Sequence, residues 1–105
     1  MNKQRLNLPL ISCIVPVFNG ERYLREALDS IFAQTYRPLE ILVADDGSTD
    51  GTPSIVAGFE NRLRYLRQDN QGPAAARNLG IRAAIGDFVA FLDADDLWHP
   101  EKLER

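Results

Sequence analysis

Carboxylates crowd at the end of an apolar segment near the C-terminal end of the chain. Asp93, Asp95 and Asp96 follow the run Phe88–Leu92, with only Ala94 between them. Acids packed at the end of a buried strand repel one another and are costly to desolvate, so a cation from outside would relieve the conflict. Carboxylates at positions i and i+2 of an extended segment point to the same side, and their oxygens suit Mg²⁺ or Mn²⁺. Asp93 and Asp95 are therefore a candidate metal site. The alternative is a solvated acidic turn in which Asp96 caps a following helix.

A second acidic segment, Asp45–Ser48, ends the apolar run Leu39–Ala44. An acid at the end of a strand in a nucleotide-binding sheet can accept hydrogen bonds from a ribose hydroxyl or a nucleobase N–H. Asp45 and Asp46 are therefore candidate ligand residues. Asp, Gly and Ser are equally favourable turn residues, so the segment by itself leaves ligand binding and a simple turn both open.

Two further segments offer groups that a nucleotide could use. Phe18 precedes the turn signal Asn19-Gly20 and could stack on a base, although core packing is the commoner fate of an isolated phenylalanine. The segment Gly72–Asn78 opens a predicted helix with small residues, and a helix N-terminus favours anions. Arg77 stands in the first turn of that helix, where the dipole disfavours a cation. It is expected either to serve an anion or carboxylate or to be an exposed surface arginine.

Composition indicates part of one globular domain. The chain has 105 residues, of which 45% are hydrophobic and 26% charged, and its net charge of -3 gives no general attraction for nucleic acid or an anionic membrane. Cys13 lies in an apolar run, so a buried thiol and a reducing compartment are expected. His99 is interpreted as a surface histidine, with metal ligation as the alternative.

The ends of the chain carry no targeting or membrane signal that we recognise. Residues 1–9 form a polar tail without a signal-peptide core, and no apolar stretch approaches the roughly 20 residues that cross a bilayer. A cytoplasmic location is therefore expected. Pro100–Arg105 has the character of the first turns of a helix, so we expect the chain to be a truncated piece of a longer protein.

Apolar runs alternate with amphipathic segments along the chain, which predicts β-α-β units. Strands are expected over residues 10–18, 39–44, 63–67 (at an edge of the sheet) and 88–92. Helices are expected over 21–34, where Tyr23 falls at the spacing of the apolar, core-facing side, from a Thr52 cap with Pro53 to about 59, and over 74–84. The fold class is therefore α/β, a parallel sheet with helices on both faces. Right-handed crossovers bring the carboxyl ends of the strands to one edge, where we expect a rim of polar residues: Asn19, Asp45, Asp46, Asp93 and Asp95.

Together these segments resemble the N-terminal, nucleotide-sugar-binding half of an inverting family 2 glycosyltransferase with the Rossmann-like GT-A fold. The resemblance runs from about residue 11 to 105 and covers part of one such domain. It is carried by blocks in matching order: Ile14–Asn19, Leu28, Ser30-Ile31, Gln34-Thr35, Glu40-Ile41, Val43–Thr52, Asn70–Gly72, Ala76–Asn78, Gly86 and Phe91–Asp96.

The resemblance implies roles for individual residues. Pro16 and Phe18 would lie beside the base of a nucleotide sugar, although the family usually has tyrosine where Phe18 stands, so stacking survives and a hydroxyl contact is lost. Arg77 would support the base or the acidic rim. The remaining implied roles are Asp46 at the base edge, Asp45 beside it, Asn19 in the nucleotide site, Asp93 on ribose or a metal-bound water, and Asp95 as the direct ligand of Mn²⁺ or Mg²⁺.

The implied reaction moves a sugar from a nucleoside diphosphate, UDP being the commoner one in the family, to a hydroxyl of a carbohydrate or lipid-linked acceptor, with inversion. The full-length protein would work in the cytoplasm or at the cytoplasmic face of a membrane. The catalytic base is expected downstream of residue 105, so this stretch would hold donor and metal only. We expect it to transfer little or no sugar alone, and turnover by the isolated chain would contradict that expectation.

Two other hypotheses fit parts of the sequence. An Asp-x-Asp after an apolar strand also occurs in phosphatases of the haloacid dehalogenase type, where Asp93 would attack phosphate. Against this, Leu97 stands where a Thr or Val is expected, and the motif comes last in the chain. The other alternative is a non-catalytic nucleotide-binding or interaction module. If the chain is a glycosyltransferase half, it should bind UDP only with Mn²⁺, and the Asp95→Ala variant should not bind UDP.

Overall fold

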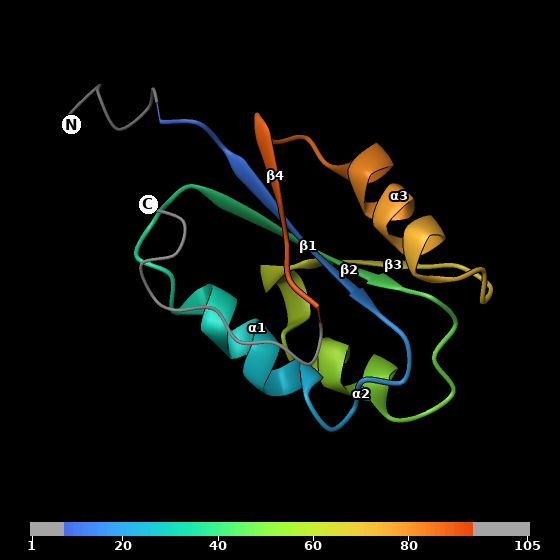
Figure 1. The fold of residues 1–105 in the computed structure, drawn as a ribbon. Helices are drawn as coiled ribbons and strands as arrows, with labels where there is room; N and C mark the ends of the chain where they lie inside the picture. The colour runs from blue at the N-terminus through green and yellow to red at the C-terminus, as the bar shows by residue number, and fades with distance from the viewer. Residues whose placement is uncertain (1–7, 94–105) are drawn as a thin grey trace.

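The computed structural model describes residues 8–93, so the expectations for Asp95, Asp96, His99 and the 100–105 helix lie outside the described residues. The described chain folds as one parallel sheet flanked by helices (Figure 1). Its elements are β1 (Ile11–Val17), α1 (Leu24–Phe32), β2 (Leu39–Asp45), α2 (Thr52–Ala57), a 3₁₀ turn η2 (Glu60–Arg62), β3 (Arg64–Arg67), α3 (Pro73–Ala83) and β4 (Phe88–Phe91).

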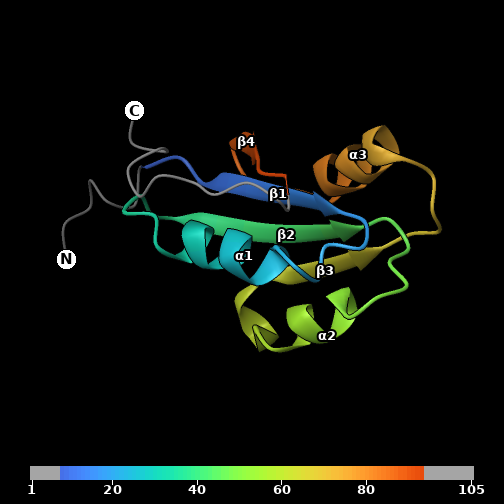
Figure 2. The ribbon, with the colours of Figure 1, turned by 60° about the horizontal axis from the view of Figure 1, so that its bottom comes forward.

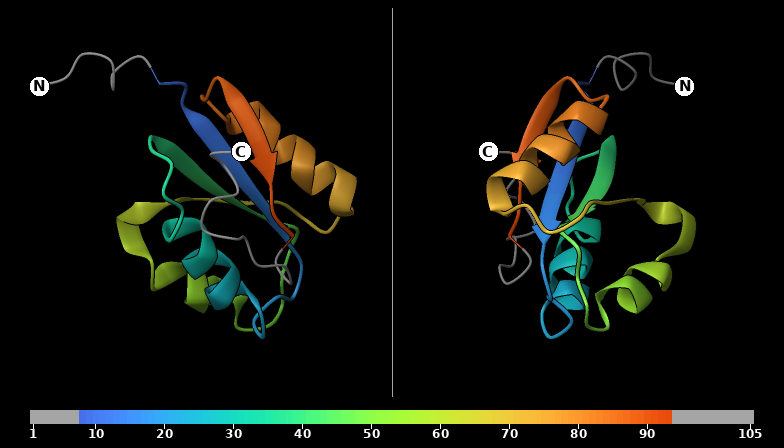
Figure 3. Two further views of the ribbon diagram at one scale, coloured as in Figure 1. Left: turned by 60° about the vertical axis from the view of Figure 1, so that its left-hand side comes forward. Right: turned by 90° about the vertical axis from the view of Figure 1, so that its right-hand side faces the viewer.

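All strand pairings are parallel, in the order β3-β2-β1-β4. β1 lies inside the sheet and pairs with β2 from Ile11↔Leu39 to Val17↔Asp45, and the arrows of β1 and β4 run the same way in Figure 3. This confirms the predicted α/β fold and the edge position of the strand near residues 63–67. Residues after each strand therefore meet at one edge, as parallel topology requires.

The two faces of the sheet are covered by different helices (Figure 2). Successive side chains of a strand point to opposite faces, so Cys13, Val15 and Val17 pack with the buried residues of α1 and with Val56 of α2. On the opposite face, α3 lies so close to β1 that a Cβ at Gly80 would come within 2.5 Å of the Ile14 Cγ2 atom. None of the helices described has the length and apolar character to span a bilayer.

The predicted helix over 21–34 begins later than expected. Residues 21–23 form a turn in which the amides of Tyr23 and Leu24 donate to the Gly20 carbonyl, at 3.0 and 2.8 Å. The apolar spacing had included Tyr23 in the core-facing side of this helix, and that interpretation is wrong, since Tyr23 is 51% exposed. Thr52 is likewise not the cap of α2. It is the first helical residue, is fully buried and accepts a hydrogen bond from the Gly20 amide at 3.0 Å.

A polar network joins the amino-terminal ends of the strands to the end of α3. Glu40 Oε2 accepts from Ser12 Oγ at 2.6 Å and from the Ile85 amide at 3.0 Å. Arg64 bridges Glu40 Oε1 and the Ala83 carbonyl, both at 2.7 Å. Burial alone would raise the pKa of Glu40, but these donors and the Arg64 charge outweigh it and hold that pKa below its usual value.

The contact between α3 and β1 gives the first prediction. Gly80→Ala should destabilise the chain by about 1–3 kcal/mol, because the added methyl group overlaps Ile14, a side chain that is fully buried. Alanine in an exposed helix would instead stabilise by up to about 1 kcal/mol relative to glycine. Urea denaturation measures the difference. In an Ile14→Ala background the penalty should shrink or change sign, and an equal penalty in both backgrounds would show that the close approach is not its cause.

Candidate functional site

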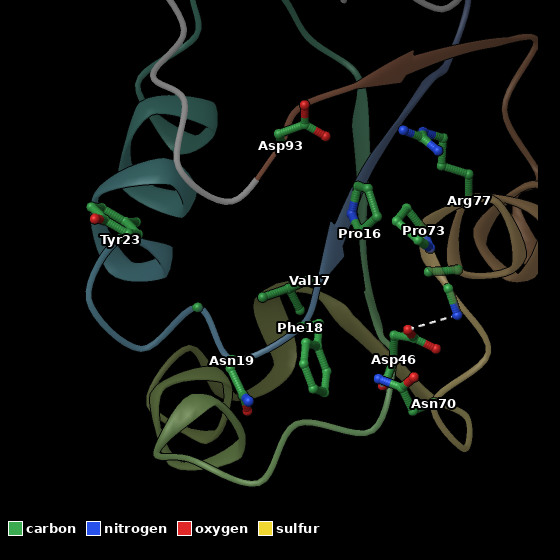
Figure 4. A pocket seen from close by; sticks show the side chains of 13 residues that line it. Pro16, Val17, Phe18, Asn19, Tyr23, Asp46, Asn70, Pro73, Arg77 and Asp93 are labelled. Carbon is green, nitrogen blue, oxygen red and sulfur yellow. Dashed lines mark hydrogen bonds between the residues drawn. The ribbon is translucent and has the colours of Figure 1, made fainter.

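A cavity of about 540 Å³ opens at the carboxyl ends of the strands. Figure 4 shows its lining side chains, which come from β1 and the turn after it, from the residue after β2, from the loop before α3, from α3 and from the segment after β4. The lining residues are Pro16, Val17, Phe18, Asn19, Gly20, Tyr23, Asp46, Asn70, Gly72, Pro73, Ala76, Arg77 and Asp93. The structure therefore brings together every described residue proposed from the sequence except Asp45.

One wall is the end of β1. Phe18 is 51% exposed and lines the cavity, so it is not packed in the core, and its ring face is free to stack. Asn19 has a left-handed backbone, with φ of 51°. Its amide donates to Ser48 Oγ and its Oδ1 accepts from the Thr49 amide, both at 2.8 Å. The wall is thus held in place by the turn that follows β2.

The opposite wall is organised by Asp46, which is only 4% exposed. Its Oδ1 accepts from the Gln71 amide at 2.7 Å and from Gln68 Nε2 at 2.8 Å, and its Oδ2 accepts from the Gly72 amide at 3.0 Å. Burial would raise the pKa of this carboxyl, but the donors outweigh burial and keep the pKa below its usual value. Asp46 is therefore ionised at neutral pH and fastens the 68–72 loop to the pocket.

The turn after β2 passes very close to that loop. A Cβ at Gly47 would lie 2.9 Å from the Asn70 backbone nitrogen, and Gly47 has a φ of 81°. Both the space and the left-handed backbone require glycine here. This close passage places Asn70 at the cavity beside Asp46.

Asp45 has a different position from its neighbour. It is fully buried, does not line the cavity, and accepts from the Ser48 amide at 2.8 Å, Tyr65 Oη at 2.5 Å and Arg67 Nη1 at 3.0 Å. Burial, and then the hydrogen bond to this carboxylate, raise the pKa of Tyr65, so Tyr65 remains a donor at neutral pH. The expectation that Asp45 contacts a nucleotide gains no support from this geometry.

The charges left over at the cavity belong to Arg77 and Asp93. Arg77 is half-buried one turn into α3, and Asp93 is exposed just after β4. Neither side chain makes a hydrogen bond or ion pair with another residue in the range 8–93. The residues of that range also contain no cluster of three or more His, Cys, Asp or Glu able to hold a metal. Asp93 fits a site of the Mg²⁺ or Mn²⁺ type, in which one or two carboxylates act together with substrate phosphates.

Several lining residues were not foreseen. Tyr23 was assigned to a helix because its spacing matched the core side, and only the turn over 21–23 brings it to the cavity. Asn70 lies in a loop whose path depends on its contacts with Asp46 and Gly47. The one sequence signal for Asn70 was its place beside Gln71-Gly72 in a motif block.

Comparison with known proteins identifies relatives of the chain. The family model for "Glycosyl transferase family 2" matches residues 12–105. An uncharacterized glycosyltransferase of Rickettsia conorii, RC0461, is 48% identical over 106 residues, covering 99% of this chain and 18% of that protein. The phosphatase interpretation is thereby overturned.

Solved structures give the same result. TarS of S. aureus, residues 1–349 in complex with UDP-GlcNAc, matches with a TM-score of 0.83 and 37% identity over 90% of this chain and 29% of that chain. The mannosyltransferase PcManGT from Pyrobaculum calidifontis, in complex with GDP-Man and Mn²⁺, matches with a TM-score of 0.79 and 35% identity over 91% of this chain and 33% of that chain. The chain therefore spans well under half the length of each of these relatives.

The hydrogen bonds of Asp46 give the second prediction. Asp46→Asn should destabilise the chain at neutral pH by about 1–3 kcal/mol, because an amide nitrogen would replace an acceptor of the loop donors. A carboxyl group whose pKa is lowered in the folded state stabilises the fold at pH values above its ordinary pKa of 3.8. This stabilisation is lost as the pH falls through the folded-state pKa. The stability gap to the wild type should therefore narrow below that value. Asp69→Asn, an exposed acid of the same loop, is the control in denaturation series, and a gap independent of pH would contradict the prediction.

Proposed function

This chain belongs to glycosyl transferase family 2, and from that premise we propose that its cavity binds the nucleoside diphosphate of a sugar donor for transfer to an acceptor hydroxyl. The proposal draws support from TarS, which was solved with UDP-GlcNAc, and from PcManGT, which was solved with GDP-Man and Mn²⁺. We take UDP as the nucleotide of this chain, since TarS resembles it with the higher TM-score.

The observation that carries the proposal is the combination of groups on one cavity. Phe18 offers a free ring for the base, Asp46 an ionised acceptor for its N–H groups, and Arg77 a cation that has no partner among residues 8–93. An unpaired guanidinium in a half-buried site is suited to an anionic ligand, because it forms charge-assisted hydrogen bonds with phosphate or carboxylate oxygens. A nucleoside diphosphate presents a base, a ribose and a polyanion together.

Asp93 and Asp95 would hold the divalent ion, Mn²⁺ or Mg²⁺, which supplies charge neutralisation for the departing diphosphate when it is bound. Asp93 lies on the same cavity as Arg77. The residues of this chain would thus bind the base at the β1 and β2 ends and orient the diphosphate towards the end of β4.

We further propose that transfer inverts the sugar and uses a general base from outside residues 8–93. Inversion requires a carboxylate that removes the proton from the acceptor hydroxyl. Asp46 is unsuited to this task, because its lowered pKa makes it a weak base. The acceptor in this proposal is a carbohydrate or a lipid-linked one.

The third prediction tests donor binding directly. Calorimetry of the chain should show UDP binding in the presence of Mn²⁺, and Arg77→Gln should weaken it about tenfold, the effect of one lost charge-assisted contact. Arg82→Gln is the matched control, since Arg82 is an exposed arginine of the same helix that does not line the cavity. Equal affinities for both variants would contradict the assigned role of Arg77, and absence of any UDP binding by the folded wild type would contradict the proposal itself.

A further inference from the structure

A charged network is centred on the residue next to Asp46 and contributes no residue to the lining of the cavity. Its centre is Asp45, fully buried at the end of β2, and its donors are Tyr65 and Arg67 of β3. Arg67 also donates through Nη2 to the Ser48 carbonyl at 2.7 Å and through Nη1 to Tyr65 Oη at 3.2 Å. A buried carboxylate without such partners would be strongly destabilising, so the network is a costly feature to maintain at this place.

The network reaches the cavity through the turn after β2. Asp45 Oδ1 holds the Ser48 amide at 2.8 Å while Arg67 holds the Ser48 carbonyl, so both sides of that residue's backbone are fixed. Ser48 Oγ then accepts from the Asn19 amide at 2.8 Å, and the Thr49 amide donates to Asn19 Oδ1. Asn19 and the adjoining Phe18 line the cavity. A continuous path of hydrogen bonds therefore connects β3 to the wall on which a base would stack.

We infer that Asp45, Tyr65 and Arg67 are positioning residues for nucleotide binding, which set the place of Phe18 and Asn19 through Ser48 without touching the ligand. This inference rests on the proposed function of the cavity. It assigns the two neighbouring acids different tasks, because Asp46 faces the ligand and Asp45 fixes the opposite wall. Loss of the network should lower nucleotide affinity, because Phe18 and Asn19 would be displaced, while the contacts made by Asp46 and Arg77 stay intact.

The sheet contains a matched control at its other end. Arg64 and Arg67 belong to the same strand, their side chains are 47% and 45% exposed, and each joins a carboxylate of β2 to a backbone carbonyl. The Arg64–Glu40 pair fastens the end of α3 at the amino-terminal ends of the strands, away from the cavity lining. The Arg67–Asp45 and Arg64–Glu40 pairs are therefore chemically similar and differ in whether they lie near the cavity.

The fourth prediction compares Arg67→Lys with Arg64→Lys. Lysine keeps the charge but has no fork, so it cannot hold the carboxylate and the carbonyl as arginine does. Arg67→Lys should weaken UDP binding with Mn²⁺ about three- to tenfold, as expected for one lost hydrogen bond, while Arg64→Lys leaves it within about twofold. Nuclear magnetic resonance should show displaced amide signals of Asn19 and Thr49 in the free Arg67→Lys protein only, a signature that a general loss of stability does not produce.

A second pair, Asp45→Asn and Glu40→Gln, repeats the comparison from the carboxylate side, with affinities measured where all variants are folded. Asp45→Asn should weaken UDP binding more than Glu40→Gln. If the wild type binds UDP and the variants near the cavity bind it no more weakly than their controls, or if the Asn19 and Thr49 signals stay in place, the inference is wrong and the proposed function stands. If the wild type binds no UDP, the proposed function fails and this inference fails with it.

Discussion

The rim of this sheet depends on two adjacent carboxylates that are both withdrawn from water at the end of β2. Asp45 is fully buried and Asp46 is 4% exposed, so each must be satisfied by protein donors. Asp45 takes its donors from β3 and the turn after β2, and Asp46 takes its donors from the loop that leads into α3. Because those donors belong to different segments, the two acids fix both walls of the cavity at once.

The same arrangement explains why the cavity suits a nucleotide. Because Asp45 and Asp46 accept hydrogen bonds from protein donors, the groups left for a ligand are the ring of Phe18, a remaining acceptor position on Asp46, and the charges of Arg77 and Asp93. Base, ribose and phosphate need stacking, hydrogen bonding and positive charge respectively. The preformed walls reduce what a ligand must order when it binds.

Most of the fold could be predicted from the sequence. Apolar runs and helical spacing indicate that strands and helices alternate along the chain, and this alternation predicts a parallel sheet. The turn over residues 21–23 could not be predicted, since it depends on hydrogen bonds to the Gly20 carbonyl. It exposes Tyr23, which was expected to face the core. In the site, Asp46 and Phe18 were predicted and line the cavity, whereas Asp45, which was also predicted, does not line it. Asp45 and Asp46 are adjacent in the sequence, but successive side chains of an extended segment point in opposite directions. Only the hydrogen bonds with Tyr65 and Arg67 show that Asp45 is the one that points away from the cavity.

Binding of a nucleoside diphosphate at this rim can be measured by adding UDP with Mg²⁺ to the ¹⁵N-labelled chain and recording the shifts of its amide signals. If the rim binds UDP, the largest amide shifts should fall on residues 17–20, 46 and 70–77, which form the two walls and the start of α3. Shifts concentrated instead on the exposed apolar surface at Ile85 and Phe88, with the rim unchanged, would contradict it.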